Sequence, residues 1–259
     1  MLSEMGVTEG LEIHHDGDLP ARSGLGSSSS FTVGLLNALH AFRGQMASKG
    51  QLAGEAIRIE QEVIGEAVGS QDQMWAAYGG LNRIDFNMDG SIDVTPLVMD
   101  HERRERLQSH LVLYFTGLSR YAPDIEQEKI ANLGKHKVEL RAMRTLVDEA
   151  ESINGNPQRD LNDLDRLLHE GWMLKRALSP NVSSAMIDTL YETALGAGAL
   201  GGKLLGGGFL LLFVPPERQV ALRERLKDLT AVKFRFDNGG SKVVVYQPDD
   251  FGLRAKERL

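Results

Sequence analysis

The chain has 259 residues, of which 42% are hydrophobic and 25% are charged, enough for one large buried core or two smaller ones. It contains no cysteine, which excludes disulfides, thiolate catalysis and cysteine-ligated metals. A net charge of −7 argues against general affinity for nucleic acid. No apolar run approaches the ~20 residues of a membrane helix, and the N-terminus does not resemble a secretory signal, so we expect a cytoplasmic protein.

Apolar periodicity predicts both helices and strands in the first half of the chain. In chain order we expect a strand at 11–16, helices at 31–42, 51–67 and 72–78, and strands at 81–86 and 91–94 joined by a turn. Gly44 and Gly79 follow the first and third predicted helices and end them. Glu60 lies on an apolar row of the second helix, which predicts that its carboxylate faces inward.

The second half of the chain also mixes helices and strands, after a charged run at 100–106 that marks a candidate domain boundary. The expected elements are a strand at 111–115, helices at 124–153, 161–178 and 183–195, a glycine-rich segment at 196–208, and strands at 209–214, 232–236 and 243–246. The last two strands are predicted to form a hairpin across residues 238–240.

The most informative motif is PARSGLGSSSS at 20–30, which leads directly into the first predicted helix. Glycines let a backbone approach a phosphate closely, and the first amides of a helix are unpaired donors at the positive end of its dipole. Four consecutive serines exceed what a helix cap requires, although a capped helix start is the alternative. We expect an anion-binding loop, but not a Walker loop, because no Gly-Lys-Ser/Thr follows at the required spacing.

Two carboxylates, Glu60 and Asp72, follow this loop in the chain. Buried carboxylates are costly unless they are paired or bind a metal. One could ligate Mg²⁺ beside the phosphates while the other accepts a proton from an attacking hydroxyl, as phosphoryl transfer requires. The alternative is a boundary residue and a helix-capping aspartate.

Other motifs are weaker. The acidic stretch at 85–96 imitates an EF-hand, but its twelfth position is Pro96, so we predict a hairpin turn. The G-x-G-x-x-G at 196–201 follows a predicted helix and leads towards a strand, the reverse of a dinucleotide fingerprint. Lys175 and Lys203 could supply positive charge to a substrate phosphate.

Taken together, these motifs resemble those of the GHMP kinases, the family of galactokinase, homoserine kinase and mevalonate kinase. Segment 20–30 resembles the family's phosphate loop, 69–73 with 79–80 its catalytic-aspartate block, and 198–214 its glycine-rich third block. The bacterial heptose kinase branch carries stretches similar to HHDGDLPARSGLGSSSSF, GSQDQ, YGGLNRI, TGLSR and GALGGKLL. That branch phosphorylates the anomeric hydroxyl of D-glycero-D-manno-heptose 7-phosphate, in a route to nucleotide-activated heptose for surface polysaccharide.

The resemblance implies an α+β fold with two domains. Residues 1–104 would form the family's N-terminal domain, which is ribosomal-protein-S5-like, and residues 105–259 its ferredoxin-like C-terminal domain. In relatives a strand block precedes the phosphate loop, whereas this chain starts just before that loop, so we expect an incomplete first domain. The third block is also shorter, because Leu205 is followed by only three glycines before Phe209.

The resemblance also implies roles for individual residues. Asp72 would be the base or orienting group for the sugar hydroxyl, and Ser28 and Glu60 would hold Mg²⁺. The residues expected to bind the nucleotide are Pro20, Gly24, Leu25, Gly26, Ser27, Ser28, Ser29 and Ser30. The residues expected near the sugar substrate are Ser119, Arg120, Gly207 and Gly208.

These assignments predict an ATP- and Mg²⁺-dependent kinase that converts heptose 7-phosphate into the 1,7-bisphosphate. Its partners would be a sugar phosphate and a nucleotide, with no nucleic acid and no membrane, and a homo-oligomer stays open. One alternative is another sugar kinase of the family, similar to galactokinase or fucokinase. The other is a truncated, non-catalytic remnant that retains nucleotide binding.

Overall fold

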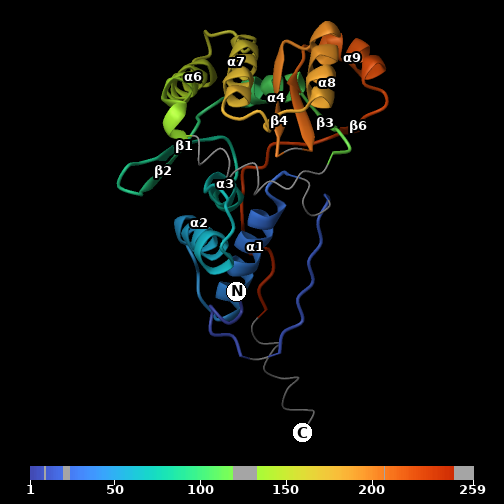
Figure 1. Cartoon of the computed structure of the whole chain (residues 1–259). Helices are drawn as coiled ribbons and strands as arrows, with labels where there is room; N and C mark the ends of the chain where they lie inside the picture. Colours follow the sequence, from blue (N-terminus) through green and yellow to red (C-terminus); the bar gives the residue numbers. More distant parts are fainter. Residues whose placement is uncertain (9, 20–23, 119–132, 207, 248–259) are drawn as a thin grey trace. The chain divides into compact units, whose positions relative to one another are not determined.

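The computed structural model divides into two compact units (Figure 1). Unit 1 contains Met1–Ala21, Gly26–Gly80 and Asp237–Leu259, and unit 2 contains Arg22–Leu25 and Leu81–Phe236. The structure describes residues 1–8, 10–19, 24–118, 133–206 and 208–247. No helix in these ranges is long and apolar enough to cross a membrane. Helices and antiparallel sheets both occur, which confirms the predicted α+β class.

Unit 1 is built on helices α1 (Ser27–Phe42), α2 (Lys49–Arg58) and α3 (Gln71–Tyr78). The α2 helix begins where the Ser48 side chain accepts a hydrogen bond from the Gln51 amide. It continues into a π-helical segment, η1 (Ile59–Ile64), and ends at Gly65, whose φ of 79° is left-handed. Fully buried side chains form the contact between the helices: Val33, Leu36 and Leu39 on α1, and Leu52, Ala53 and Ala56 on α2. The predicted helices of this region are confirmed, with shifts of a few residues at their ends.

The segment that starts at Asp237 packs against the end of α3. The Asp237 carboxylate accepts hydrogen bonds from the amides of Gly239 and Gly240 at 3.0 Å, and the Ser241 amide donates to the Ala77 carbonyl at 3.2 Å. Gly79 and Gly240 both have positive φ, 64° and 59°. A Cβ added to Gly79 would lie 2.7 Å from the Gly240 Cα, so the two backbones touch directly. This approach is open only to glycine.

Several predicted strands are wrong. Residues 10–17 form no strand, β6 covers only Thr230–Val232, and residues 233–247 form neither strand nor hairpin. A strand is stable only when a neighbour takes its backbone hydrogen bonds. Near 237–241 those bonds go to the end of α3, as the Gly80 amide shows by donating to the Asp237 carbonyl at 2.6 Å.

Unit 2 contains an antiparallel sheet with the strand order β4-β5-β3-β6. Its other strands are β3 (Leu111–Phe115), β4 (Gly201–Leu205) and β5 (Phe209–Phe213). The β4 strand lies inside the glycine-rich segment, where no strand was predicted. Five helices described in unit 2 surround the sheet: α4 (His101–His110), α6 (Lys137–Gly155), α7 (Asp163–Ala177), α8 (Ala185–Gly196) and α9 (Gln219–Arg225).

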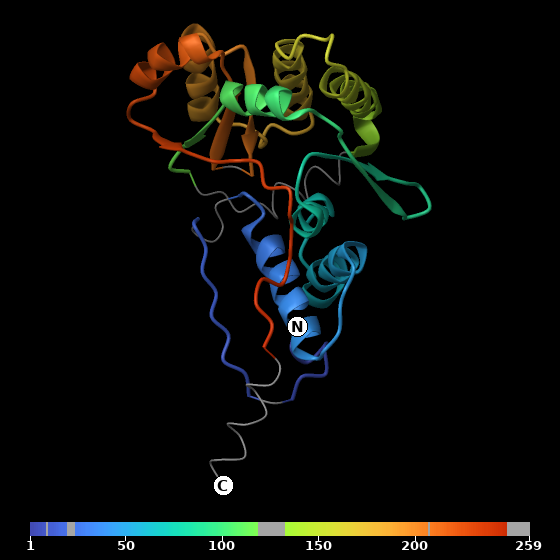
Figure 2. The ribbon, with the colours of Figure 1, turned by 180° about the vertical axis from the view of Figure 1, so that it is seen from behind.

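The helices cover both faces of this sheet. Figure 1 shows α7 and α8 in front of it, and Figure 2, from behind, shows α4 on the opposite face. The β5 strand is buried on both faces for this reason: Leu210 and Leu212 join a cluster with Trp172, whereas Phe213 joins one with Leu107 of α4. Such continuous burial explains its uninterrupted apolar sequence.

The hairpin of β1 (Asn82–Phe86) and β2 (Ile92–Pro96) confirms the turn predicted in place of an EF-hand.

The charged run at 100–106 does not separate the units. It lies in unit 2 and starts α4, whose cap Asp100 accepts a hydrogen bond from the Arg103 amide at 2.7 Å. The boundary between the two family domains, predicted between residues 104 and 105, stays a prediction. Of the helix predicted at 124–153, residues 124–132 lie outside the described residues, Leu133–Lys135 form a short 3-10 helix, and α6 (Lys137–Gly155) covers the remainder.

We expect the Gly240→Ala variant to lower the free energy of unfolding by more than the Gly44→Ala variant. Both glycines have positive φ, which costs a residue with a Cβ about 1 kcal/mol. Only at Gly240 would the new Cβ also collide with backbone, 2.7 Å from the Gly79 nitrogen, whereas at Gly44 the nearest atom is 3.9 Å away. Urea denaturation measures both values, and equal losses would contradict the contact between these backbones.

Candidate active site

The predicted anion-binding loop enters α1 through two glycines with left-handed backbones, Gly24 and Gly26, with φ of 82° and 69°. Gly26 is the N-cap of α1, so Ser27 to Ser30 lie in the first turn and none of them is the cap. The alternative of a serine-capped helix start is therefore wrong. The first amides of α1 are left without a capping side chain, which suits an anionic ligand.

Gly24 is in close backbone contact with another glycine of unit 2. A Cβ on Gly24 would lie 2.7 Å from the carbonyl carbon and oxygen of Gly206, in the turn between β4 and β5. Beyond that turn the Gly208 carbonyl accepts hydrogen bonds from the Thr116 amide and hydroxyl, at 2.9 and 3.0 Å. Within unit 2, Gly24 of the predicted phosphate loop thus touches Gly206 of the predicted third glycine block backbone to backbone.

Glu60 is buried, with 1% of its surface exposed, as the apolar row predicted. Its Oε2 accepts a hydrogen bond from the Ser29 hydroxyl at 2.9 Å and a second from the Gln73 amide nitrogen. Among the described residues its Oε1 accepts a single hydrogen bond, a long one of 3.5 Å from the Ser28 hydroxyl. One oxygen is thus held by two donors, and the other keeps most of its capacity as an acceptor.

The π-helical segment η1 carries Glu60 near its start. A π-turn adds a residue to the helical repeat, and such turns are frequent at functional sites. Later in the same segment, Val63 and Ile64 are exposed although both are apolar. Within this irregular segment the carboxylate of Glu60 is thus buried, whereas the apolar side chains that follow it are exposed.

Asp72 lies in the first turn of α3, on an exposed position next to the loop. A Cβ on Gly26 would lie 3.1 Å from the Asp72 Oδ2, so the missing side chain makes room for this carboxylate. Glu60 and Asp72 thus both approach the start of α1, through Ser29 and Gly26 respectively. Sequence analysis predicted that these groups act together, and the structure brings them together.

Gln73 is a site residue that sequence analysis missed. Its side chain is completely buried, its amide nitrogen donates to Glu60, and its Oε1 has no hydrogen-bond partner among the described residues. A buried polar atom without a partner is unusual and marks a candidate functional position. In the sequence, only its position directly after Asp72 pointed to Gln73. Helical periodicity gives no reason to expect that its side chain donates a hydrogen bond to Glu60.

These oxygen atoms suit Mg²⁺. This ion prefers oxygen ligands and is commonly held by one or two carboxylates together with phosphates and water. The Glu60 Oε1 and the Ser28 hydroxyl supply such oxygens, and the unpartnered Gln73 Oε1 lies in the same network. Within the described ranges no group of three His, Cys, Asp or Glu could hold a metal ion.

Four predicted site residues lie outside the described residues. They are Pro20, Ser119, Arg120 and Gly207. Their predicted contacts with nucleotide and sugar stay predictions.

Comparison with known proteins identifies relatives of this chain. Residues 1–80 match the family described as "GHMP kinases N terminal domain". The chain is 33% identical over 219 residues to the D-glycero-alpha-D-manno-heptose 7-phosphate kinase of Campylobacter jejuni subsp. jejuni serotype O:2, covering 83% of this chain and 64% of the relative. It is 30% identical over 217 residues to the mevalonate kinase of Methanothermobacter thermautotrophicus, covering 76% and 64%.

A solved structure shows the same similarity in three dimensions. The D-glycero-D-manno-heptose 1-phosphate kinase from Bacteroides thetaiotaomicron superposes with a TM-score of 0.64 at 29% identity, covering 89% of this chain and 66% of that one. This chain therefore spans slightly less than two thirds of the length of these relatives.

We expect Gln73→Leu to lower the free energy of unfolding by about 1.5–3 kcal/mol, because it removes a hydrogen bond to a buried charged group. Gln73→Glu keeps the shape but sets a second carboxylate against Glu60, so the free energy of unfolding should fall further than in Gln73→Leu. Gln71→Leu, on an exposed position of the same helix, is the control and should change stability little. Denaturation of all three variants tests this, and a neutral Gln73→Leu would contradict the role of Gln73.

Proposed function

Because the chain belongs to the GHMP kinase family, we propose that it transfers the γ-phosphoryl group of ATP to the anomeric hydroxyl of D-glycero-D-manno-heptose 7-phosphate. The products would be ADP and the 1,7-bisphosphate. One observation carries the proposal: the buried Glu60, held by Ser29 and Gln73, and the exposed Asp72 both lie at the N-terminus of α1. The choice of sugar rests on the similarity to heptose kinases.

The start of α1 would bind the nucleotide phosphates. Its first amides and the positive end of its dipole attract anions, and Gly24 and Gly26 let the backbone come close. No lysine of a Walker loop takes part. The loop therefore depends on backbone donors and on the hydroxyls of its serines.

Glu60 and Ser28 would hold Mg²⁺, and Glu60 is oriented for this because its Oε2 is already occupied by two donors. When bound, the ion would neutralise charge on the ATP phosphates. The two hydrogen bonds remove the need for the carboxylate to reorient during binding. Such preorganisation is the main contribution that a protein makes to phosphoryl transfer.

Asp72 would orient the sugar hydroxyl and accept its proton. The oxygen of that hydroxyl forms the new bond to phosphorus, the bond to the β-phosphate oxygen breaks, and ADP leaves. Asp72 suits this role better than Glu60 because it is exposed at the start of α3, whereas Glu60 is closed off from water. We also propose that the enzyme acts in the cytoplasm, where ATP is available.

The proposal is tested by incubating the chain with Mg-ATP and D-glycero-D-manno-heptose 7-phosphate while following ADP release and phosphorus NMR. We expect a new anomeric phosphate signal, and loss of ADP release when EDTA removes the metal. Galactose, fucose and mevalonate serve as competing acceptors, and faster turnover with one of them would replace the heptose assignment. A folded chain that binds ATP without phosphorylating any acceptor would instead be a nucleotide-binding remnant.

We expect Asp72→Asn to lower kcat by about 10²-fold or more, because it removes proton acceptance. The Kd for ATP should change little, since the phosphates would be held by α1. Asp89→Asn, in the turn of the β1–β2 hairpin, is the matched control and should leave both quantities unchanged. Calorimetric titration of ATP and steady-state kinetics measure the two effects. Unchanged kcat in Asp72→Asn would remove this residue from the mechanism.

A further inference from the structure

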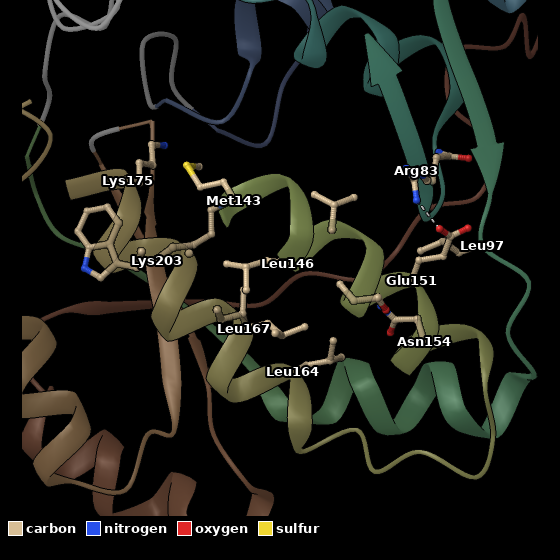
Figure 3. Close-up of a pocket in the computed structure, with 16 residues that line it drawn as sticks. Arg83, Leu97, Met143, Leu146, Glu151, Asn154, Leu164, Leu167, Lys175 and Lys203 are labelled. Atoms are coloured by element: carbon tan, nitrogen blue, oxygen red, sulfur yellow. Dashed lines mark hydrogen bonds and ion pairs between the residues drawn. The ribbon is translucent and has the colours of Figure 1, made fainter. Parts of the chain in front are cut away.

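Unit 2 contains a cavity of about 360 Å³ lined by α6, α7, the start of β1 and a residue of β4 (Figure 3). Most of its wall is apolar and includes Met143, Leu146, Leu164, Leu167 and Trp172. None of the loop and carboxylate residues described above contributes to it. Its volume lies within the range of about 300–1,000 Å³ that is typical of sites for small molecules.

At one end of the cavity the charges are balanced within the protein. Arg83 donates to Asp85 at 2.7 Å, to Asp148 at 2.8 Å and to Glu151 at 2.6 Å. Figure 3 shows Arg83 and Glu151 facing each other across this end. The charged donors of Arg83 are thus satisfied by carboxylates, and this end offers little to a charged ligand.

Lys203 on β4 is different. It lines the cavity and is partly buried, yet within the described residues its amine makes neither a hydrogen bond nor an ion pair. Burial without an acidic partner lowers the pKa of its ammonium group. A cation next to an apolar wall is costly unless an anion compensates it. The protein does not supply that anion among its described residues.

We propose that this cavity binds a small organic anion whose apolar body lies among the leucines of α6 and α7 and whose charged oxygens pair with Lys203. Carboxylates and phosphate monoesters with a short hydrocarbon body both have this chemistry. Strongly hydrated anions such as inorganic phosphate do not, because they offer nothing to the apolar wall. The site is independent of the proposed kinase function, and so is its test.

Trp172 provides the readout, because it lines the cavity, is 1% exposed and is one of only two tryptophans in the chain. A Trp75→Phe background leaves it as the single indole fluorophore. Its emission would be followed while octanoate, octyl phosphate, octanol or inorganic phosphate is titrated. We expect saturable binding of octanoate or octyl phosphate, or both, at least tenfold tighter than binding of octanol, and no response to inorganic phosphate.

Variants separate the charge from the cavity. Lys203→Met keeps a long apolar side chain and should weaken anion binding at least tenfold while leaving octanol binding unchanged. Lys227→Met is the matched control, because this exposed lysine pairs with Glu224 outside the cavity, and it should change nothing. Gly171→Leu should block all ligands, since its side chain would grow towards Leu146, whose Cδ1 would lie 3.6 Å from the new Cβ.

Thermal unfolding of each variant confirms that it is folded before binding is compared. Replacing a buried charge by an apolar residue is often neutral or stabilising, so Lys203→Met should fold. Equal affinity for octanoate, octyl phosphate and octanol would overturn the proposal, as would undiminished anion binding by Lys203→Met. Absence of saturable binding by a folded Trp75→Phe protein would also overturn it. The difference between octanoate and octyl phosphate identifies which anionic group the site prefers.

Discussion

The burial of the Glu60 carboxylate is the constraint on which the candidate active site depends. A buried charge must be met by donors, and here they come from two different helices, Ser29 on α1 and Gln73 on α3. Satisfying Glu60 therefore brings the N-termini of α1 and α3 together. The same arrangement carries Asp72 to Gly26, so one electrostatic requirement positions both carboxylates beside the anion-binding loop.

Direct contact between glycine backbones is the second organising feature. Gly79 meets Gly240 in unit 1, and Gly24 meets Gly206 in unit 2. In each case a segment distant in the sequence lies closer than any side chain would allow. Glycine is required at these positions for a physical reason. It has no side chain, so two backbone segments can come into direct contact there.

Arg83 and Lys203, two cations that line the cavity of unit 2, differ in how their charge is compensated. Arg83 has three carboxylates around it and joins the β1–β2 hairpin to α6. Lys203 lines an apolar cavity with no such partner among the described residues. Because proteins rarely keep a partly buried charge uncompensated without a use for it, the contrast between these two cations distinguishes a structural ion-pair cluster from a candidate binding site.

The sequence by itself determined the helices of unit 1, the inward position of Glu60 and the turn at 87–91, because periodicity and turn chemistry act between near neighbours. Strands at 11–16 and 243–246 were predicted wrongly, since a strand also needs a partner that local sequence does not specify. Only the tertiary structure decided that Gln73 holds Glu60, that Gly26 makes room for Asp72 and that Lys203 lines a cavity without a partner. Each of these depends on segments far apart in the chain, whose meeting is set by packing and by the satisfaction of buried polar groups.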